Sequence, residues 1–204
     1  MANALHPTSV ALRQKLAKDR RMVSLIEREY LTHSPDIVFE RENWVSAFVD
    51  YGHEVSFDRG RTRVCRAVNV RDGALFWMVR QQGKRLGYHA EGDDPLAAVE
   101  QAETAWAGRR AVRQNWAEVE ALAADLLTGR RSFRVRVQDA FDSPLCSMGV
   151  RGFLASMRMS EDRDVSGRMA AMLMKIESQV GFVIHQAHLR VSAEQPVAEA
   201  IVPA

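Results

Sequence analysis

The sequence predicts an α+β protein, and three observations along the chain support this fold class. Apolar residues recur every three to four positions near the N-terminus and again after Pro95, which is typical of amphipathic helices. Between about 53 and 90 they alternate with polar residues, which is typical of β-strands. Turn signals separate the alternating runs, so the strands are expected to form an antiparallel meander.

Two helices are expected in the first segment, residues 1–52. The first covers about 10–31, where an apolar stripe follows a start signal at Pro7, Thr8 and Ser9. The second covers about 35–52 and ends at Gly52, a residue that commonly terminates helices. Its expected apolar side comprises Ile37, Trp44, Val45, Phe48 and Tyr51.

Four alternating runs build the expected meander over about 53–90. They read HEVSF, RTRVCRAVNV, ALFWMVRQ and RLGYHA, and the segments DRGR, RDG and QQGK separate them. The dipeptide Asp72-Gly73 predicts a hairpin with a type I′ turn, in which both central residues have positive φ.

A long or broken helix is expected over 95–128. Asp93 or Asp94 is placed to cap its start, Pro95 suits its first turn, and Gly129 is placed to end it. The apolar stripe before residue 108 is displaced around the axis from the stripe after it. A bend near Gly108 to Arg110 would reconcile the two stripes.

The last third of the chain predicts a strand followed by helices. RRSFRVRVQDA alternates like a strand, Ser143-Pro144 resembles a helix start, and a further helix is expected from about 164 to 178. Residues 180–191 fit a strand or a helix, and Gly181 favours the strand. The expected organisation is 1–52, 53–128, 129–192 and a frayed tail at 193–204, in one or two compact domains.

Composition narrows the class of protein. The 204 residues are 47% hydrophobic and 26% charged, which favours a folded chain over a disordered one. Cys65 and Cys146 form no zinc-type cluster, and no signal-peptide or membrane-spanning apolar run is present. We therefore expect a reduced, cytoplasmic protein that does not bind membranes.

No motif in the chain specifies a chemistry. Phosphate-binding glycine loops and the G-x-S-x-G nucleophile motif are absent. His185 and His188 are spaced to share a metal on a helix but lack further ligands, and Cys146 near a helix start is either a reactive thiol or a core residue. We expect no catalytic residue, no metal and no cofactor.

The meander is strongly basic, although the whole chain carries a net charge of only +2. Residues 59–85 contain eight cations and one acid, Asp72. Period two places Arg61, Arg63 and Arg71 on one side of the first full strand, with small residues between them. It places Arg66 on the valine side, where it is expected to be structural if it is buried and paired.

Residues 61–107 resemble the three-strand-plus-helix domains of phage integrase arm-binding proteins and plant ethylene-response factors. The matching positions are Gly83, Lys84, Leu86 and Gly87, followed by an acidic, alanine-rich helix from Pro95 to about Ala107. In those families the open sheet face enters the major groove of DNA. The resemblance therefore implies a DNA-binding sheet with a helix packed behind it, although the segment YHAEGDDP is longer than the usual bridge.

Our leading hypothesis is a non-catalytic nucleic-acid-binding or regulatory protein that contacts phosphates through a basic sheet face. The residues expected to make these contacts are Arg61, Arg63, Arg71, Arg80, Lys84 and Arg85. The alternative is a protein–protein adaptor or homo-oligomer without affinity for DNA or RNA, in which a methionine-rich helix presents Met169, Leu173 and Ile176. An enzyme with a site assembled from scattered residues is a third interpretation.

Overall fold

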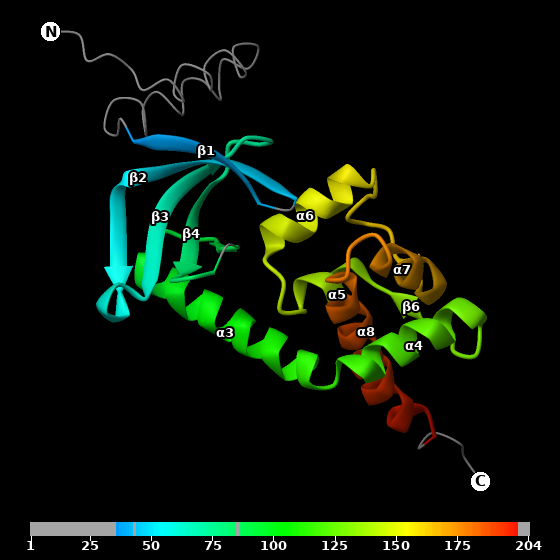
Figure 1. The fold of residues 1–204 in the computed structure, drawn as a ribbon. Helices are drawn as coiled ribbons and strands as arrows, with labels where there is room; N and C mark the ends of the chain where they lie inside the picture. Colours follow the sequence, from blue (N-terminus) through cyan, green and yellow to red (C-terminus); the bar gives the residue numbers. More distant parts are fainter. Residues whose placement is uncertain (1–35, 43, 85, 200–204) are drawn as a thin grey trace, which may run out of the picture. The chain divides into compact units, whose positions relative to one another are not determined.

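The computed structural model describes residues 36–42, 44–84 and 86–199, and it confirms the α+β class (Figure 1). The helix expected over 10–31 lies outside these residues. The chain divides into two compact units, a sheet unit at Met1–Glu103 and a helical unit at Thr104–Ala204. Each unit is described separately below.

Five antiparallel strands, paired in chain order, form the sheet. They are β1 (Ile37–Glu42), β2 (Val45–Phe57), β3 (Thr62–Asn69), β4 (Leu75–Gln81) and β5 (Tyr88–Ala90). The meander is confirmed, but the helix expected over 35–52 is wrong because β1 and the first half of β2 occupy this segment. Residues Val38, Phe39 and Val49 lay outside the assumed helical stripe. In the strands they fall into paired positions, and Phe39 packs on Phe48 across the ladder.

The β3–β4 hairpin forms as expected, but the type I′ turn is wrong. Gly73 has a φ of +76°, whereas Asp72 is not among the described residues with positive φ. The Asp72 carboxylate instead accepts a hydrogen bond from the Ala74 N–H at 3.0 Å, and the Gly73 N–H donates to the Asn69 carbonyl at 2.8 Å. The side chain of Asp72 thus stabilises a longer loop without adopting a left-handed backbone.

The sheet curls so that β1 comes close to β4 and β5, although these strands are not neighbours in the ladder. The pairing of β2 with β3 is interrupted between Asp50 and Val55, and such an irregularity bends a strand. Side chains of β1 then hydrogen-bond to β4 and to the backbone of Gly87, just before β5. The inner face of the curl buries Val49, Ala67 and Phe76 almost completely.

The long or broken helix expected over 95–128 is a broken one, formed by helix α3 (Pro95–Gln114) and helix α4 (Trp116–Thr128). The Asp94 carboxylate accepts hydrogen bonds from two N–H groups of the first turn, and Gly129 ends α4 in the left-handed conformation, so both end signals are confirmed. The break lies at Asn115, not at 108–110. Gly108 lies inside α3, and the glycine allows the helix to approach Pro144 closely, because a Cβ there would come within 3.0 Å of the Pro144 side chain.

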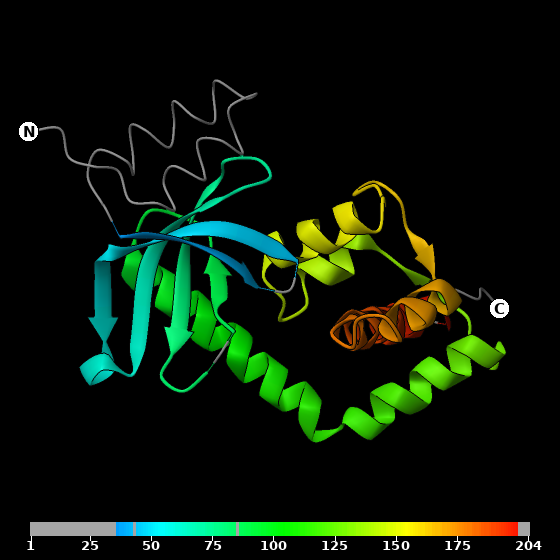
Figure 2. The same cartoon turned by 45° about the horizontal axis from the view of Figure 1, so that its top comes forward.

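The helical unit continues with short elements and one long helix (Figures 1 and 2). These are β6 (Arg134–Val135), α5 (Val137–Phe141), α6 (Ser147–Ser156), β7 (Val165–Ser166), α7 (Gly167–Met174) and α8 (Val180–Glu199). The predicted strand over RRSFRVRVQDA is therefore reduced to two residues. The helix start at Ser143-Pro144 is also misplaced, since α6 begins at Ser147 after Cys146.

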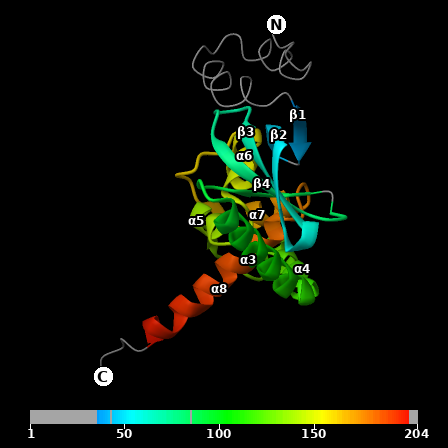
Figure 3. The same cartoon turned by 90° about the vertical axis from the view of Figure 1, so that its left-hand side faces the viewer.

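Residues 180–191 are helical, so the preference for a strand is wrong (Figure 3). Val180, Val183, Ile184 and Ala187 recur at helical spacing and line the core of the helical unit. Gly181 does not mark a strand. A side chain there would collide with Trp116, so the glycine permits close packing of α8 on α4. The helix continues to Glu199, beyond the point where a frayed tail was expected.

Candidate functional site

The structure separates the six arginines and lysines predicted to bind nucleic acid. Arg61, Arg63 and Lys84 lie at one end of the sheet, because the Gln82 N–H donates to the Arg61 carbonyl at 2.7 Å. Arg71 belongs to the β3–β4 loop. Figure 2 shows this loop at the opposite end of the sheet. Arg80 lies on the inner face of the curled sheet, and Arg85 lies outside the described residues.

We call the group Arg59, Arg61, Arg63 and Lys84 the basic end. The first three belong to the β2–β3 connection and the start of β3, and Lys84 belongs to the β4–β5 loop beside them. Arg59 is one of the eight cations of residues 59–85 but is not among the six residues predicted to bind nucleic acid. The signal that could have selected it is its place in the tip DRGR between two strands.

The tip of the β2–β3 hairpin has an uncommon backbone. Asp58, Arg59 and Gly60 have φ values of +48°, +55° and +83° in succession. A left-handed arginine costs roughly 1–2 kcal/mol, since its Cβ crowds the backbone. Strained positions of this kind concentrate at functional sites, so the tip is a candidate contact point.

Most of the charge at the basic end is exposed. Arg61 is 77% exposed and lies 4.0 Å from Asp58, and Arg63 is about half exposed and lies 3.4 Å from Glu54. Arg59 and Lys84 are exposed and form no ion pair with another described residue. Because exposed ion pairs contribute little and exchange readily with solvent, these cations remain available to an anionic ligand.

The sheet face that carries Arg63 and Arg80 is buried between the two ends of the sheet and is not open to solvent. Cys65 and Ala67 of β3, and Phe76 and Met78 of β4, are all at most 3% exposed. The small residues between the arginines therefore pack inside the curl and do not line an open groove surface. The described part of β3 and β4 has no continuous basic face.

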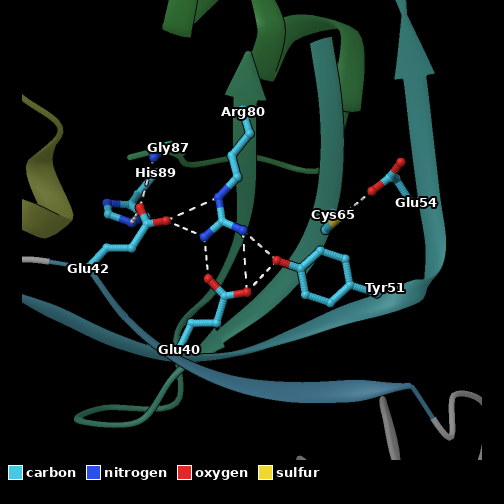
Figure 4. A network of polar contacts seen from close by, with 8 residues as sticks. All are labelled: Glu40, Glu42, Tyr51, Glu54, Cys65, Arg80, Gly87 and His89. Carbon is cyan, nitrogen blue, oxygen red and sulfur yellow. Dashed lines mark hydrogen bonds and ion pairs between the residues drawn. The ribbon is translucent and has the colours of Figure 1, made fainter. Parts of the chain in front are cut away.

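Arg80 is the centre of a polar network on this inner face (Figure 4). Its guanidinium donates to the carboxylates of Glu40 and Glu42 on β1 and lies against the hydroxyl of Tyr51. Glu42 also accepts from the Gly87 N–H at 2.9 Å, and His89 Nε2 lies 3.6 Å from it. Strands β1, β2, β4 and β5 thus meet in one cluster.

The network holds its carboxylates in the charged form. Burial alone would raise the pKa of Glu42, but the nearby His89, the hydrogen bond from Gly87 and the charge of Arg80 lower it to about 2. Burial also opposes ionisation of Glu40, yet Arg80 and Tyr51 lower the pKa of that carboxyl. The pKa of Tyr51 is raised by burial and by Glu40, so the phenol stays protonated. At neutral pH, two carboxylates surround one arginine.

A small cavity beside the network is lined by Tyr51, Glu54, Arg63, Cys65, Met78 and Arg80. Its volume of about 10 Å³ is that of roughly one water molecule. Burial and the nearby Glu54 raise the pKa of the Cys65 thiol to about 12, so this cysteine is a weak nucleophile. This cavity does not accommodate a small-molecule substrate.

Arg66 has the structural role expected of a buried and paired arginine. Its guanidinium donates to the Gly92 carbonyl at 3.1 Å and to Asp93 at 3.2 Å, and it lies over the Trp77 ring at 4.6 Å. Its side chain is 22% exposed. Arg66 therefore fastens the loop that precedes α3 to the sheet.

Comparisons with known proteins assign no family to this chain. No match is found among protein-family models, curated proteins or solved structures. The resemblance of residues 61–107 to the DNA-binding domains named above therefore stays a prediction.

One histidine of the pair on α8, His188, has partners within the protein. His188 stacks on Phe133 with ring centroids 6.3 Å apart, and its Nδ1 lies 3.4 Å from the Ser192 hydroxyl. Burial, followed by electrostatic repulsion from Arg131 and His185, lowers the pKa of His188. No group of three potential metal ligands occurs among the residues that the structure describes.

The methionine-rich helix presents a different set from the one expected. Met169 is 44% exposed, but Leu173 packs partly against the core of the helical unit, and Ile176, 63% exposed, lies in the turn after α7, which ends at Met174. Met172, 43% exposed, takes the place of Leu173 on the surface. Over 36–42, 44–84 and 86–199, no helix is both long and apolar enough to cross a membrane.

Proposed function

We propose that the protein binds the phosphate backbone of nucleic acid through the basic end, without catalysing a reaction. The observation that carries this proposal is that the β2–β3 and β4–β5 connections lie side by side, which brings Arg59, Arg61, Arg63 and Lys84 together at one end of the sheet. Guanidinium and ammonium groups that hydrogen-bond to phosphate position a protein on nucleic acid without reading its sequence.

The local charge balance favours an anionic ligand. Among the described residues, Asp58 and Glu54 are the acids that form ion pairs with these cations, and the Asp58 pair is long and exposed. A phosphate oxygen offers a stronger, charge-assisted hydrogen bond to Arg61 than a carboxylate at 4.0 Å does. Binding therefore replaces weak ion pairs and breaks no buried contact.

The proposal uses only part of the predicted set. Arg71 lies at the other end of β3, whose eight residues at about 3.3 Å each separate the two ends by roughly 23 Å. Arg80 is 15% exposed and is already bound by two carboxylates, which would repel a phosphate. We assign Arg80 to the structure of the sheet and Arg71 to a position outside the interface.

Equilibrium binding to a 20-base-pair duplex and to a 20-nucleotide single strand, measured by fluorescence anisotropy at 50 mM salt, tests the proposal. The variant Arg59→Ala/Arg61→Ala/Lys84→Ala is expected to bind roughly tenfold more weakly or worse. Two controls are Arg71→Ala in the β3–β4 loop and Arg110→Ala, an exposed cation of α3, and both should stay within twofold of wild type. The proposal fails if wild type shows no affinity, or if the triple variant binds as tightly as wild type.

A cytoplasmic location belongs to the same proposal. Cys65 and Cys146 are buried free thiols in the structure. Proteins in reducing compartments keep their thiols free, and nucleic acid is accessible there.

A further inference from the structure

Helix α7 has one buried side and one apolar side that faces solvent. Gly167, Ala170 and Ala171 are buried, and the helix packs through them against the rest of the helical unit. Met169 and Met172 are 44% and 43% exposed, and their spacing of three places them on one side of α7. Ile176, 63% exposed, lies in the turn that follows the helix, where its N–H donates to the Leu173 carbonyl at 2.9 Å. We call these three residues the α7 patch.

Two cations flank the α7 patch. Arg168 and Lys175 are both exposed, and neither forms an ion pair with another described residue. They are seven positions apart, so both lie along the same edge of the helix. Glu177, beyond the end of α7, is engaged locally, because its carboxylate accepts a hydrogen bond from the Gln179 N–H at 3.1 Å. The patch is therefore apolar at its centre and positive along one edge.

The apolar centre and positive edge of the α7 patch favour one kind of partner over a second copy of the chain. A two-fold interface uses the same surface on both chains, and where it pairs two copies of α7 antiparallel, it places Arg168 and Lys175 of one copy along the same edge as those of the other. Like charges brought together in this way oppose association. A segment with apolar residues on one side and carboxylates beside them would instead satisfy both the methionines and the cations.

We propose that the α7 patch docks an acidic amphipathic helix of a partner protein. Exposed methionines suit this role because their flexible, polarisable side chains adapt to the apolar side of a helix. Arg168 and Lys175 contribute charge complementarity, which selects acidic partners over basic ones. The surface lies in the helical unit, so it goes beyond the nucleic-acid binding proposed for the sheet unit.

A pair of designed peptides tests the proposal with the full chain. Each peptide has 16 residues with leucine at positions i, i+3, i+4 and i+7, and the remaining positions are mainly glutamate in one and lysine in the other. The glutamate peptide should bind wild type in a fluorescence anisotropy titration. Met172→Glu should weaken this binding roughly tenfold or more, and Arg168→Glu/Lys175→Glu should weaken it while improving binding of the lysine peptide.

Leu189→Glu is the matched control, because Leu189 is an exposed apolar residue, 50% accessible, on α8. It should leave the peptide affinity unchanged, and Met172→Glu should leave the affinity for the duplex unchanged. Equal binding of both peptides, or an unaffected Met172→Glu variant, would overturn the proposal. If light scattering shows that wild type is a dimer and that Met172→Glu dissociates it, the patch binds a second copy of this chain. If Met172→Glu loses binding to anionic vesicles but keeps its affinity for the glutamate peptide, the patch binds a lipid surface.

Discussion

Replacing Arg80 by methionine should destabilise the sheet unit strongly. The side chain is 15% exposed, and its partner Glu42 is 7% exposed, so the substitution leaves two carboxylates facing each other in a mostly buried site. Removing one partner of a buried ion pair typically costs about 3–5 kcal/mol. The pKa of Glu42 supports this scale, because the difference between about 2 and 4.5 corresponds to roughly 3 kcal/mol of interaction with all its partners.

Hydrogen exchange followed by mass spectrometry measures this effect in peptides from β3 and β4, separately from the helical unit. A loss of about 3–5 kcal/mol accelerates their exchange by roughly two to three and a half powers of ten where exchange requires unfolding of the sheet. Arg63→Met is the matched control, since Arg63 lies directly opposite Arg80 in the β3–β4 register but is half exposed. It should cost less than about 1 kcal/mol. Equal effects of the two substitutions would refute the structural role given to Arg80.

Three further predictions follow from the same strands. The folded-state pKa of Glu42, about 2, lies below its ordinary value of 4.5, so the stability that its charge contributes is complete above pH 4.5 and is lost as the pH falls toward 2. In urea titrations, the free energy of unfolding should fall by about 2 kcal/mol between pH 7 and pH 3, and Glu42→Gln should remove this pH dependence. Gly87→Ala should lower the melting temperature in circular dichroism, because the new Cβ would lie 2.7 Å from Met78 Sδ and 3.1 Å from the Val79 carbonyl oxygen. With a pKa of about 12, only about one Cys65 thiol in ten thousand is ionised at pH 8, so iodoacetamide should alkylate it far more slowly in the native protein than in the urea-unfolded protein.

The sequence pattern predicted the elements whose position depends on residues close together in the chain, such as turns and helix ends. The alternation and the turn glycines between 53 and 90 identified the meander, and Asp94 and Gly129 marked the ends of α3 and α4. The segment 37–51 misled the prediction because a few apolar residues chosen at helical spacing match a helix as well as a strand. Gly181 misled it for a different reason, since close packing against Trp116, and not a turn, requires the glycine there.

The candidate site could be predicted only in part, because contacts between distant residues decide which arginines are available. Glu40 and Glu42 precede Arg80 by about 40 positions and lie in a segment that was expected to be helical. The curvature of the sheet brings Glu40 and Glu42 to Arg80, and these contacts hold Arg80 on the inner face, away from the basic end. The proximity of Lys84 to Arg61 likewise depends on the β3–β4 register, which no single segment reveals.

The salt dependence of duplex binding tests the central proposal most directly. If Arg59, Arg61, Arg63 and Lys84 each contact a phosphate, the logarithm of the association constant should fall with the logarithm of the salt concentration with a slope of about −3.6. Affinity should then decrease roughly 150-fold between 50 and 200 mM salt. The triple variant that retains only Arg63 should show a slope near −0.9. A wild-type slope near zero, or a slope that the three substitutions leave unchanged, would contradict nucleic-acid binding at the basic end.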